Sequence, residues 1–297
     1  MHDRIVLVPR MSVDAQWLSL SLGAMEASKS SGTSLFRSGP SDDADVRTQI
    51  ALMNRAIDAQ ARGVVVYPIT LFTMERVIQE AVSQRIPVVV LVAPIGIPPS
   101  DHLSYVLTDE DEGARAIAEQ LVSSLGVSGD VLLIGISPQA PGVIDRADKI
   151  EEAIRRVAPQ IQIAQKIADT TSSGFAEQEI LSALQADLRI RSVISLNARM
   201  GAAAASAVER LGSHRHVAVI AYGQSLQLFL QLRRGEIDGL LVQDMRRMGR
   251  IAVENINSDR SGEPYAHTVS VKPYLVTRDN IDSAAIQRLV LMHGDER

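Results

Sequence analysis

Short apolar runs rich in β-branched residues alternate with longer amphipathic stretches along most of this chain. A short apolar run is typical of a strand buried on both faces of a parallel sheet, and an amphipathic stretch is typical of a covering helix. In the first part of the chain the expected strands are 5–8, 64–67 and 88–92, and the expected helices are 18–30, 44–62 and 73–84. This alternation predicts a doubly wound parallel sheet of the α/β class.

A second series of the same kind follows the loop-like residues 94–99. Its expected strands are 105–107, 131–136, 161–167, 192–196, 217–222 and 240–243, and a last extended segment is expected at 268–275. Its expected helices are 110–125, 147–156, 174–184, 200–211 and 248–258. Two series of similar length predict two similar lobes.

Composition excludes several classes of protein. The chain has 297 residues, 46% of them hydrophobic, which is enough for a core in each of two domains. Its formal net charge is −5 and it has no long stripe of Lys and Arg, so nucleic acid is not an expected partner. It has no cysteine, which excludes disulfides, thiolate nucleophiles and Cys-based zinc sites. The first apolar run, 5–8, is too short for a signal peptide, and no apolar stretch is long enough to span a bilayer.

The usual catalytic motifs are missing as well. There is no Gly-x-Ser-x-Gly elbow, no phosphate-binding loop ending in Gly-Lys-Ser/Thr and no dinucleotide glycine motif after the first strand. We interpret His214 and His216 as part of a solvated turn rather than a metal pair. The acidic run 109–112 is interpreted as the first turn of a helix, where carboxylates stabilise the positive end of the dipole. We expect no catalytic residues, no metal and no cofactor.

Five segments spread over the whole chain resemble the type I periplasmic binding proteins, particularly the ribose-receptor-like sugar-binding subfamily. The segments are 12–17 with Gly23 and Ala24, Gln49 with 61–68, 195–198 with Gly201 and Ala202, 235–243 with Gly249, and 274–282. The resemblance implies two lobes joined by three crossing strands, near 104–108, Gln243 and 271–275. It implies an N-terminal lobe of 1–107 plus 244–273 and a C-terminal lobe of 108–243 plus 274–297. The ligand would lie in the cleft between the lobes, which close on it by a hinge.

The resemblance also implies a set of ligand contacts. Trp17 would stack on sugar C–H groups, Arg146 would hold hydroxyls or a carboxylate through paired hydrogen bonds, and Asn197 would both donate and accept. The full expected set is Ser12, Gln16, Trp17, Tyr67, Thr108, Arg146, Thr170, Asn197, Tyr222 and Gln243. Structural alternatives stay open: a core position for Trp17, helix capping by Ser12 or Asp14, and a surface ion pair of Arg146 with Asp145 or Glu151.

Two positions depart from the family pattern. Val92 and Gly223 stand where sugar receptors usually carry an Asp. If both carboxylates are missing, Arg146 has no compensating charge, and an uncompensated arginine favours a ligand that carries a negative charge or has fewer hydroxyls. We therefore hypothesise a sugar acid, a modified sugar or another small polar metabolite rather than a plain aldopentose.

The function that the resemblance implies is that of the periplasmic, or otherwise extracytoplasmic, receptor of an ABC importer. Such a receptor is expected to be a monomer that binds a small polar ligand and presents its closed form to the membrane permease, without any chemistry. One alternative is a ligand-sensing module that docks on a membrane kinase or chemoreceptor. Another is the effector domain of a truncated transcription regulator, which would need a helix-turn-helix that this sequence lacks. An enzyme is the remaining alternative, without a candidate residue set.

Overall fold

The chain divides into two compact units. The computed structural model describes residues 3–42, 44–125, 128–212 and 215–290. Unit 1 comprises Met1–Thr108, Gln139–Gly142 and Asp244–Val271, and unit 2 comprises Asp109–Pro138, Val143–Gln243 and Lys272–Arg297. The chain thus passes between the units after Thr108, Gln243 and Val271, and the short segment Gln139–Gly142 is a further excursion into unit 1. These units differ from the expected lobes at Thr108, at 139–142 and at 272–273.

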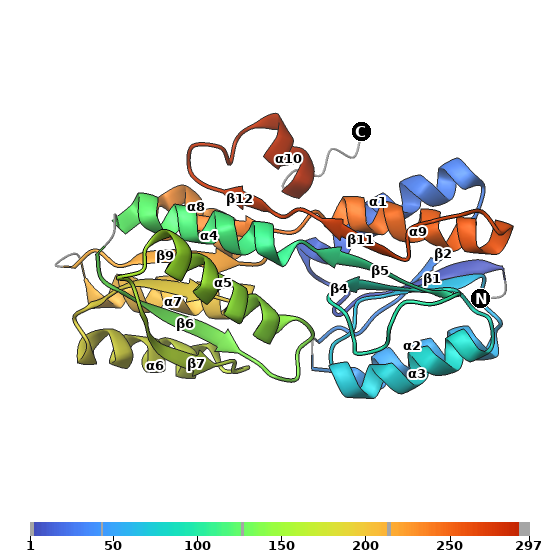
Figure 1. The fold of residues 1–297 in the computed structure, drawn as a ribbon, viewed down its shortest axis with the longest axis horizontal. Helices are drawn as coiled ribbons and strands as arrows, with labels where there is room; N and C mark the ends of the chain where they lie inside the picture. Colours follow the sequence, from blue (N-terminus) through green and yellow to red (C-terminus); the bar gives the residue numbers. More distant parts are fainter. Residues whose placement is uncertain (1–2, 43, 126–127, 213–214, 291–297) are drawn as a thin grey trace. The chain divides into compact units, whose positions relative to one another are not determined.

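Unit 1 is built on a six-stranded, wholly parallel sheet (Figure 1). The strand order is β11-β5-β4-β3-β1-β2. The strands are β1 (Arg4–Val8), β2 (Ser34–Arg37), β3 (Gly63–Val66), β4 (Val88–Val92), β5 (Leu103–Thr108) and β11 (Thr268–Val271). Helices α1 (Ala15–Ser31) and α9 (Met245–Ser261) pack on one face, and α2 (Val46–Asp58) and α3 (Leu71–Ser83) pack on the other.

The two faces of this sheet explain why its central strands are apolar throughout. In β1, Ile5 and Leu7 belong to the core under α1 and α9, whereas Val6 and Val8 belong to the core under α2 and α3. Because both faces are covered by helices, the four residues from Ile5 to Val8 are all buried, and only Arg4 at the start of the strand is exposed. The buried runs that predicted strands from the sequence are therefore a consequence of the doubly wound arrangement.

Helices α1 and α9 cross at unusually close range. A Cβ atom placed on Gly23 would lie 1.8 Å from the carbonyl oxygen of Arg246, and one placed on Gly249 would lie 2.3 Å from that of Leu20. Neither distance is possible for a real side chain, so each helix needs a glycine where the other helix passes. The crossing positions the first turn of α1, which carries several of the expected ligand contacts.

Unit 2 repeats the same architecture. Its strands are β6 (Asp130–Ile136), β7 (Ile163–Ala168), β8 (Ile190–Ser195), β9 (Ala218–Tyr222), β10 (Gly239–Val242) and β12 (Tyr274–Val276). The order is β12-β10-β9-β8-β6-β7, and only β12 runs antiparallel to its neighbour. Helices α6 (Ser173–Ala186), α7 (Ala198–Leu211), α8 (Leu226–Arg234) and α10 (Ala284–Val290) share one core with the sheet. Helices α4 (Glu110–Leu125) and α5 (Val143–Val157) pack on each other and on the sheet.

Both sheets have the strand order 2-1-3-4-5, followed by one added strand that comes from the end of the chain. This confirms the expected fold class of two similar, doubly wound, largely parallel lobes. Two expectations were wrong in detail. Strand β5 completes the first sheet instead of opening the second series, and the single extended segment expected at 268–275 is two strands, one in each unit. Pro273 separates them because proline cannot donate to a strand ladder.

Three elements were not expected from the sequence: β2, α8 and α10. Strand β2 lies at the edge of its sheet and has no buried residue, so it lacks the continuous apolar run of a central strand. Within the described residues, no helix combines the length and the apolar character that crossing a membrane requires.

Candidate functional site

The expected ligand contacts lie at the carboxyl ends of the parallel strands in both units, an edge of each sheet that we call its carboxyl edge. Ligands of open α/β sheets bind at this edge, where the strand order reverses. The reversal falls between β1 and β3 in unit 1 and between β6 and β8 in unit 2. Five expected residues end or follow strands of unit 1, namely Ser12, Gln16, Trp17, Tyr67 and Thr108. The other five end or follow strands of unit 2, namely Arg146, Thr170, Asn197, Tyr222 and Gln243.

In unit 1, the loop after β1 is held by its own polar residues. The Asp14 carboxylate accepts a hydrogen bond from the backbone N–H of Trp17 at 2.7 Å and so caps α1. The Ser12 hydroxyl donates to the carbonyl oxygen of Pro40 at 2.8 Å, so Ser12 ties two loops together and is not the cap. Gln16 and Trp17 follow in the first turn of α1, both partly buried.

A buried glutamine bridges the point of strand reversal in unit 1. The Gln49 side chain is fully buried, and its amide nitrogen donates to the carbonyl oxygens of Pro9 at 2.9 Å and Tyr67 at 2.7 Å. Its amide oxygen accepts from the backbone N–H of Ile69 at 2.9 Å. One neutral side chain therefore fixes the loops that leave β1 and β3, and with them the backbone of Tyr67.

The end of β4 adopts a strained turn. Val92 has a φ angle of +76°, and the backbone N–H of Ala93 donates to the carbonyl oxygen of Leu91 at 3.0 Å. A hydrogen bond from the N–H of residue i+2 to the carbonyl oxygen of residue i, around a central residue with positive φ, defines the rare form of the γ-turn. A β-branched residue rarely adopts the positive φ that this turn requires. The turn breaks the alternation of the strand, because Leu91 and Val92 both join the core under α1 and α9.

The carboxyl edge of unit 1 is consequently apolar at this point. Trp17 and Tyr67 pack, partly buried, against the same core that contains Val92. Val92 itself is 2% exposed. Where the resemblance led us to expect an aspartate, an aliphatic side chain thus lies in the core, and the two aromatic residues that pack against this core remain partly accessible.

Unit 2 places a buried ion pair at its carboxyl edge. Arg146, in the first turn of α5, donates from Nε to the Glu110 carboxylate oxygens at 3.2 and 3.0 Å and from Nη2 to Oε1 at 2.7 Å. Its Nη1 donates to the carbonyl oxygen of Leu196 at 3.1 Å. Both side chains of the pair are 7% exposed. The guanidinium thereby bridges the strand reversal between β6 and β8.

Tyr222, the last residue of β9, completes this cluster. The guanidinium carbon of Arg146 lies 3.7 Å from the centroid of the Tyr222 ring. The Tyr222 hydroxyl donates to Glu110 Oε2 at 3.2 Å. The premise of an uncompensated Arg146 was therefore wrong, and so was the alternative of a surface pair with Asp145 or Glu151. The charge of Arg146 is balanced by Glu110, which is 36 residues away in sequence.

The remaining expected residues of unit 2 have structural partners or are buried. Asn197 caps α7 by accepting from the backbone N–H of Met200 at 2.9 Å, which leaves its amide nitrogen as the group that could donate to a ligand. The Thr170 hydroxyl accepts from the backbone N–H of Ser172 at 3.2 Å. Gln243 is 2% exposed and directly follows β10.

Gly223 cannot be an aspartate in this backbone conformation. Its φ is +128°, and a Cβ atom on it would lie 2.9 Å from the backbone nitrogen of Ala198 at the start of α7. A side chain at this position would be strained and would collide with backbone atoms. The aspartate that the resemblance led us to expect here would therefore require a different backbone conformation.

Comparison with known proteins gives the family. Residues 5–263 match the model of a family described as periplasmic binding protein domain. This chain belongs to the periplasmic binding protein family. A comparison with curated protein sequences returns no match.

Solved structures of solute-binding and sugar-binding proteins share the fold over nearly all of this chain. A carbohydrate transporter solute-binding protein from Agrobacterium radiobacter, in complex with D-arabinose, has a TM-score of 0.86 at 21% identity, covering 97% of this chain and 99% of that one. An ABC transporter solute-binding protein from Agrobacterium vitis, bound to α-D-tagatopyranose, has a TM-score of 0.87 at 19% identity, covering 97% and 98%. A glucose-galactose binding protein from Geobacillus stearothermophilus has a TM-score of 0.85 at 21% identity, covering 95% and 99%. At these identities the likeness shows the fold.

Three residues of this periplasmic binding protein matter at the carboxyl edges although the sequence did not single them out as site residues. Glu110 balances Arg146, and Gln49 holds the loops of unit 1. Gln224 follows Gly223 and is 3% exposed, and neither polar atom of its amide has a hydrogen-bond partner among the described residues. A buried amide without partners is costly, which makes Gln224 a further candidate for a polar contact.

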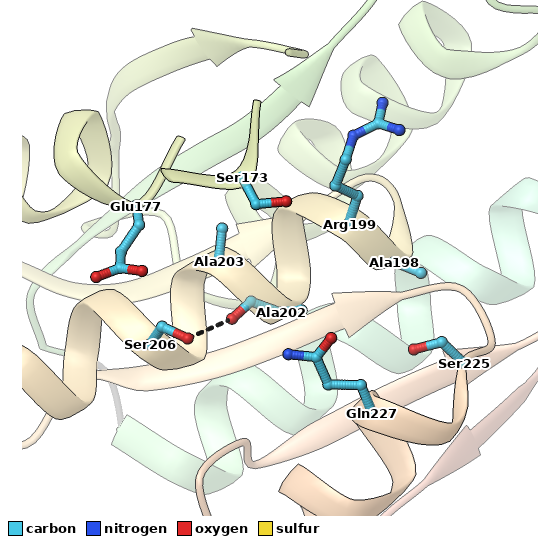
Figure 2. Close-up of a pocket in the computed structure, with 9 residues that line it drawn as sticks. All are labelled: Ser173, Glu177, Ala198, Arg199, Ala202, Ala203, Ser206, Ser225 and Gln227. Atoms are coloured by element: carbon cyan, nitrogen blue, oxygen red, sulfur yellow. Dashed lines mark hydrogen bonds between the residues drawn. The ribbon is translucent and has the colours of Figure 1, made fainter. Parts of the chain in front are cut away.

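A separate hollow of ≈ 340 Å³ lies on the outside of unit 2, over α6, α7 and α8 (Figure 2). Alanines of α7 form its floor, and Ser173, Glu177, Ser225 and Gln227 stand around it. Arg199 points away from this floor in Figure 2 and donates to the carbonyl oxygen of Thr170 at 2.8 Å. None of the expected ligand contacts lines this hollow.

Metal binding has no support among the residues that the structure describes. They contain no group of three or more His, Asp or Glu side chains placed to hold an ion. His216 is exposed, and His214 lies outside the described residues.

Proposed function

We propose that this periplasmic binding protein is the extracytoplasmic solute-binding component of an ABC importer and that it binds a small sugar or sugar-like polar solute at the carboxyl edges of its two sheets. The observation that carries the proposal is the position of all ten expected contacts at these edges, five in each unit. The sugar complexes of proteins with the same fold support it. The chain is proposed to act as a monomer.

The two edges offer complementary groups for a sugar. Trp17 and Tyr67 in unit 1 provide flat apolar surfaces for C–H groups, and Asn197 and Gln243 in unit 2 provide amides that pair with hydroxyls. Recognition of this kind needs no proton transfer and no covalent intermediate. The protein therefore acts by binding and release.

The proposed partner is a membrane permease. Genes for a permease and an ATPase beside the gene of this chain would support transport. A kinase or chemoreceptor gene in that place would instead favour ligand sensing with the same binding site.

Calorimetric titration with a panel of aldopentoses, aldohexoses and ketohexoses tests the proposal directly. We expect at least one of these sugars to bind saturably with one site per chain. Gln243→Ala should weaken that affinity at least tenfold, whereas Gln178→Ala, which changes an exposed amide of the same unit, should not. If no monosaccharide binds, the proposal is wrong.

A further inference from the structure

The Glu110 carboxylate occupies the side of Arg146 that an anionic ligand would need. A guanidinium holds a carboxylate best through two neighbouring N–H groups that point in the same direction. One of the two such pairs in Arg146 is Nε and Nη2, and both of these atoms donate to Glu110, over distances of 2.7 to 3.2 Å. The place for a ligand carboxylate is filled by a carboxylate of the protein.

The other sides of the guanidinium are also in contact with protein groups. Nη1 donates to the carbonyl oxygen of Leu196 at 3.1 Å, and the Tyr222 ring covers one face of the guanidinium at 3.7 Å. The Tyr222 hydroxyl holds Glu110 from a second direction, at 3.2 Å. These contacts fix both members of the pair, so neither is expected to turn toward an incoming ligand.

The charges around this cluster leave no excess positive charge at the edge. Arg146 and Glu110 carry opposite unit charges, and both are buried. The nearest turn of α4 adds the carboxylate of Asp111, which pairs with Lys149 at 2.9 Å, and Asp145 shares the same lysine at 3.7 Å. A ligand carboxylate would therefore approach a like charge on Glu110 and a guanidinium that is already neutralised.

We propose that Glu110 is the built-in counter-ion of Arg146 and that this pair makes the carboxyl edge of unit 2 select uncharged sugars over sugar acids. This inference rests on the proposed function, and it replaces the acidic ligand that the sequence suggested. Glu110 acts as a positioning residue: it orients the guanidinium and cancels its charge.

The test compares sugars that differ only at C6, where the neutral sugar has a hydroxymethyl group and the sugar acid has a carboxylate. Calorimetry is run with D-galactose against D-galacturonate and with D-glucose against D-glucuronate. For the wild-type chain we expect the neutral member of a pair to bind more tightly, by on the order of a hundredfold, because like charges face each other in the other case. In Glu110→Gln this preference should fall at least tenfold. Asp111→Asn is the matched control, since it removes the same charge from the next residue, which is 79% exposed, and should leave the preference unchanged.

Two results would overturn the inference. One is a wild-type chain that binds the uronate more tightly than the neutral sugar. The other is that Glu110→Gln and Asp111→Asn show the same preference for the neutral sugar over its uronate.

A second measurement does not depend on the sugar. Thermal unfolding of Glu110→Gln, Arg146→Met and the double variant should show that the double variant loses less in Tm than the two single losses combined, because each single change leaves a buried charge without its partner. Additive losses would contradict the counter-ion role. The two experiments disagree if the losses in Tm are non-additive although the chain binds neither neutral nor acidic monosaccharides. That result would support the counter-ion role of Glu110, but it would overturn the proposed function and the proposed selection of uncharged sugars.

Discussion

Units 1 and 2 have the same strand order but bridge the point of strand reversal with different chemistry. In unit 1 the bridge is the neutral amide of Gln49, which holds only backbone groups. In unit 2 the bridge is the guanidinium of Arg146, which holds the carbonyl oxygen of Leu196 and needs Glu110 to balance its charge. The same topology therefore accepts either an amide or a compensated ion pair at this place.

The side chains near the two bridges also differ between the units, being more apolar in unit 1 and more polar in unit 2. Val92, Trp17 and Tyr67 form an apolar, aromatic part of the carboxyl edge of unit 1. In unit 2, Tyr222 contacts the ion pair, and Asn197 directly follows Leu196, whose carbonyl oxygen Arg146 holds. A sugar has both C–H faces and hydroxyl groups, so one apolar edge and one polar but neutral edge suit an uncharged sugar.

The largest effect is expected from removing the charged bridge. Arg146→Met leaves the Glu110 carboxylate buried without its cation and should lower the free energy of unfolding by about 3–5 kcal/mol. Urea unfolding measures this loss. Arg210→Met is the control, because Arg210 pairs with Glu177 at the surface of the same unit and is 54% exposed, so its loss should stay below about 1 kcal/mol. If the two variants lost the same free energy of unfolding, the buried ion pair would contribute no more to stability than the exposed one.

The neutral bridge should come next. Gln49→Leu leaves two carbonyl oxygens and one N–H group in unit 1 without their partner and should cost about 2–4 kcal/mol in the same assay. The exposed Gln79→Leu should change stability by less than about 0.5 kcal/mol. If Gln49→Leu proved more damaging than Arg146→Met, the difference drawn between the two bridges would be reversed.

The strained turn in unit 1 makes a smaller, differential prediction. Val90→Gly and Val92→Gly each delete a buried valine side chain from β4, but only position 92 has a positive φ angle, which glycine adopts without strain. Val92→Gly should therefore cost about 1–3 kcal/mol less than Val90→Gly. Comparison of the two unfolding midpoints measures this difference, and equal costs would mean that the turn at Val92 stores no strain.

The smallest effect is expected from an exposed ion pair of unit 1. The hydrogen bond from Arg246 holds the pKa of Glu26 below its ordinary value of 4.5, with further help from Arg250. Folding lowers the pKa of Glu26, so the ion pair stabilises the folded chain fully when the pH is above the ordinary pKa. This stabilisation is lost as the pH falls through the lowered pKa of the folded state. Glu26 is 39% exposed, so Glu26→Gln should cost less than about 1 kcal/mol at pH 7. In unfolding curves, the difference between wild type and variant should shrink as the pH falls below 4.5 and vanish once the pH is below the lowered pKa, and a constant difference would contradict this origin.

The sequence predicted the fold well because the β-branched runs and amphipathic stretches are local signals. It failed at β2, where an edge strand has no buried run, and at Pro273, which divides one extended segment into two strands. The pairing of the site residues was not predictable in the same way. An acidic residue in the first turn of a helix has the same sequence pattern whether it is exposed, like Asp111, or paired across 36 residues, like Glu110. The positive φ of Val92 likewise has no signature in a run of valines.

The fluorescence of Trp17, the sole tryptophan of the chain, offers the most direct test of sugar binding at both carboxyl edges. The neutral sugar that binds best in calorimetry is titrated into the wild type, into Gln243→Ala and into the control Gln178→Ala. We expect a saturable change of Trp17 emission in the wild type and the control, with a half-saturation concentration that rises at least tenfold in Gln243→Ala, because the reporter is in unit 1 and the change is in unit 2. Sugar binding at both carboxyl edges would be contradicted if no neutral sugar changed the Trp17 emission. It would also be contradicted if Gln243→Ala left the half-saturation concentration unchanged.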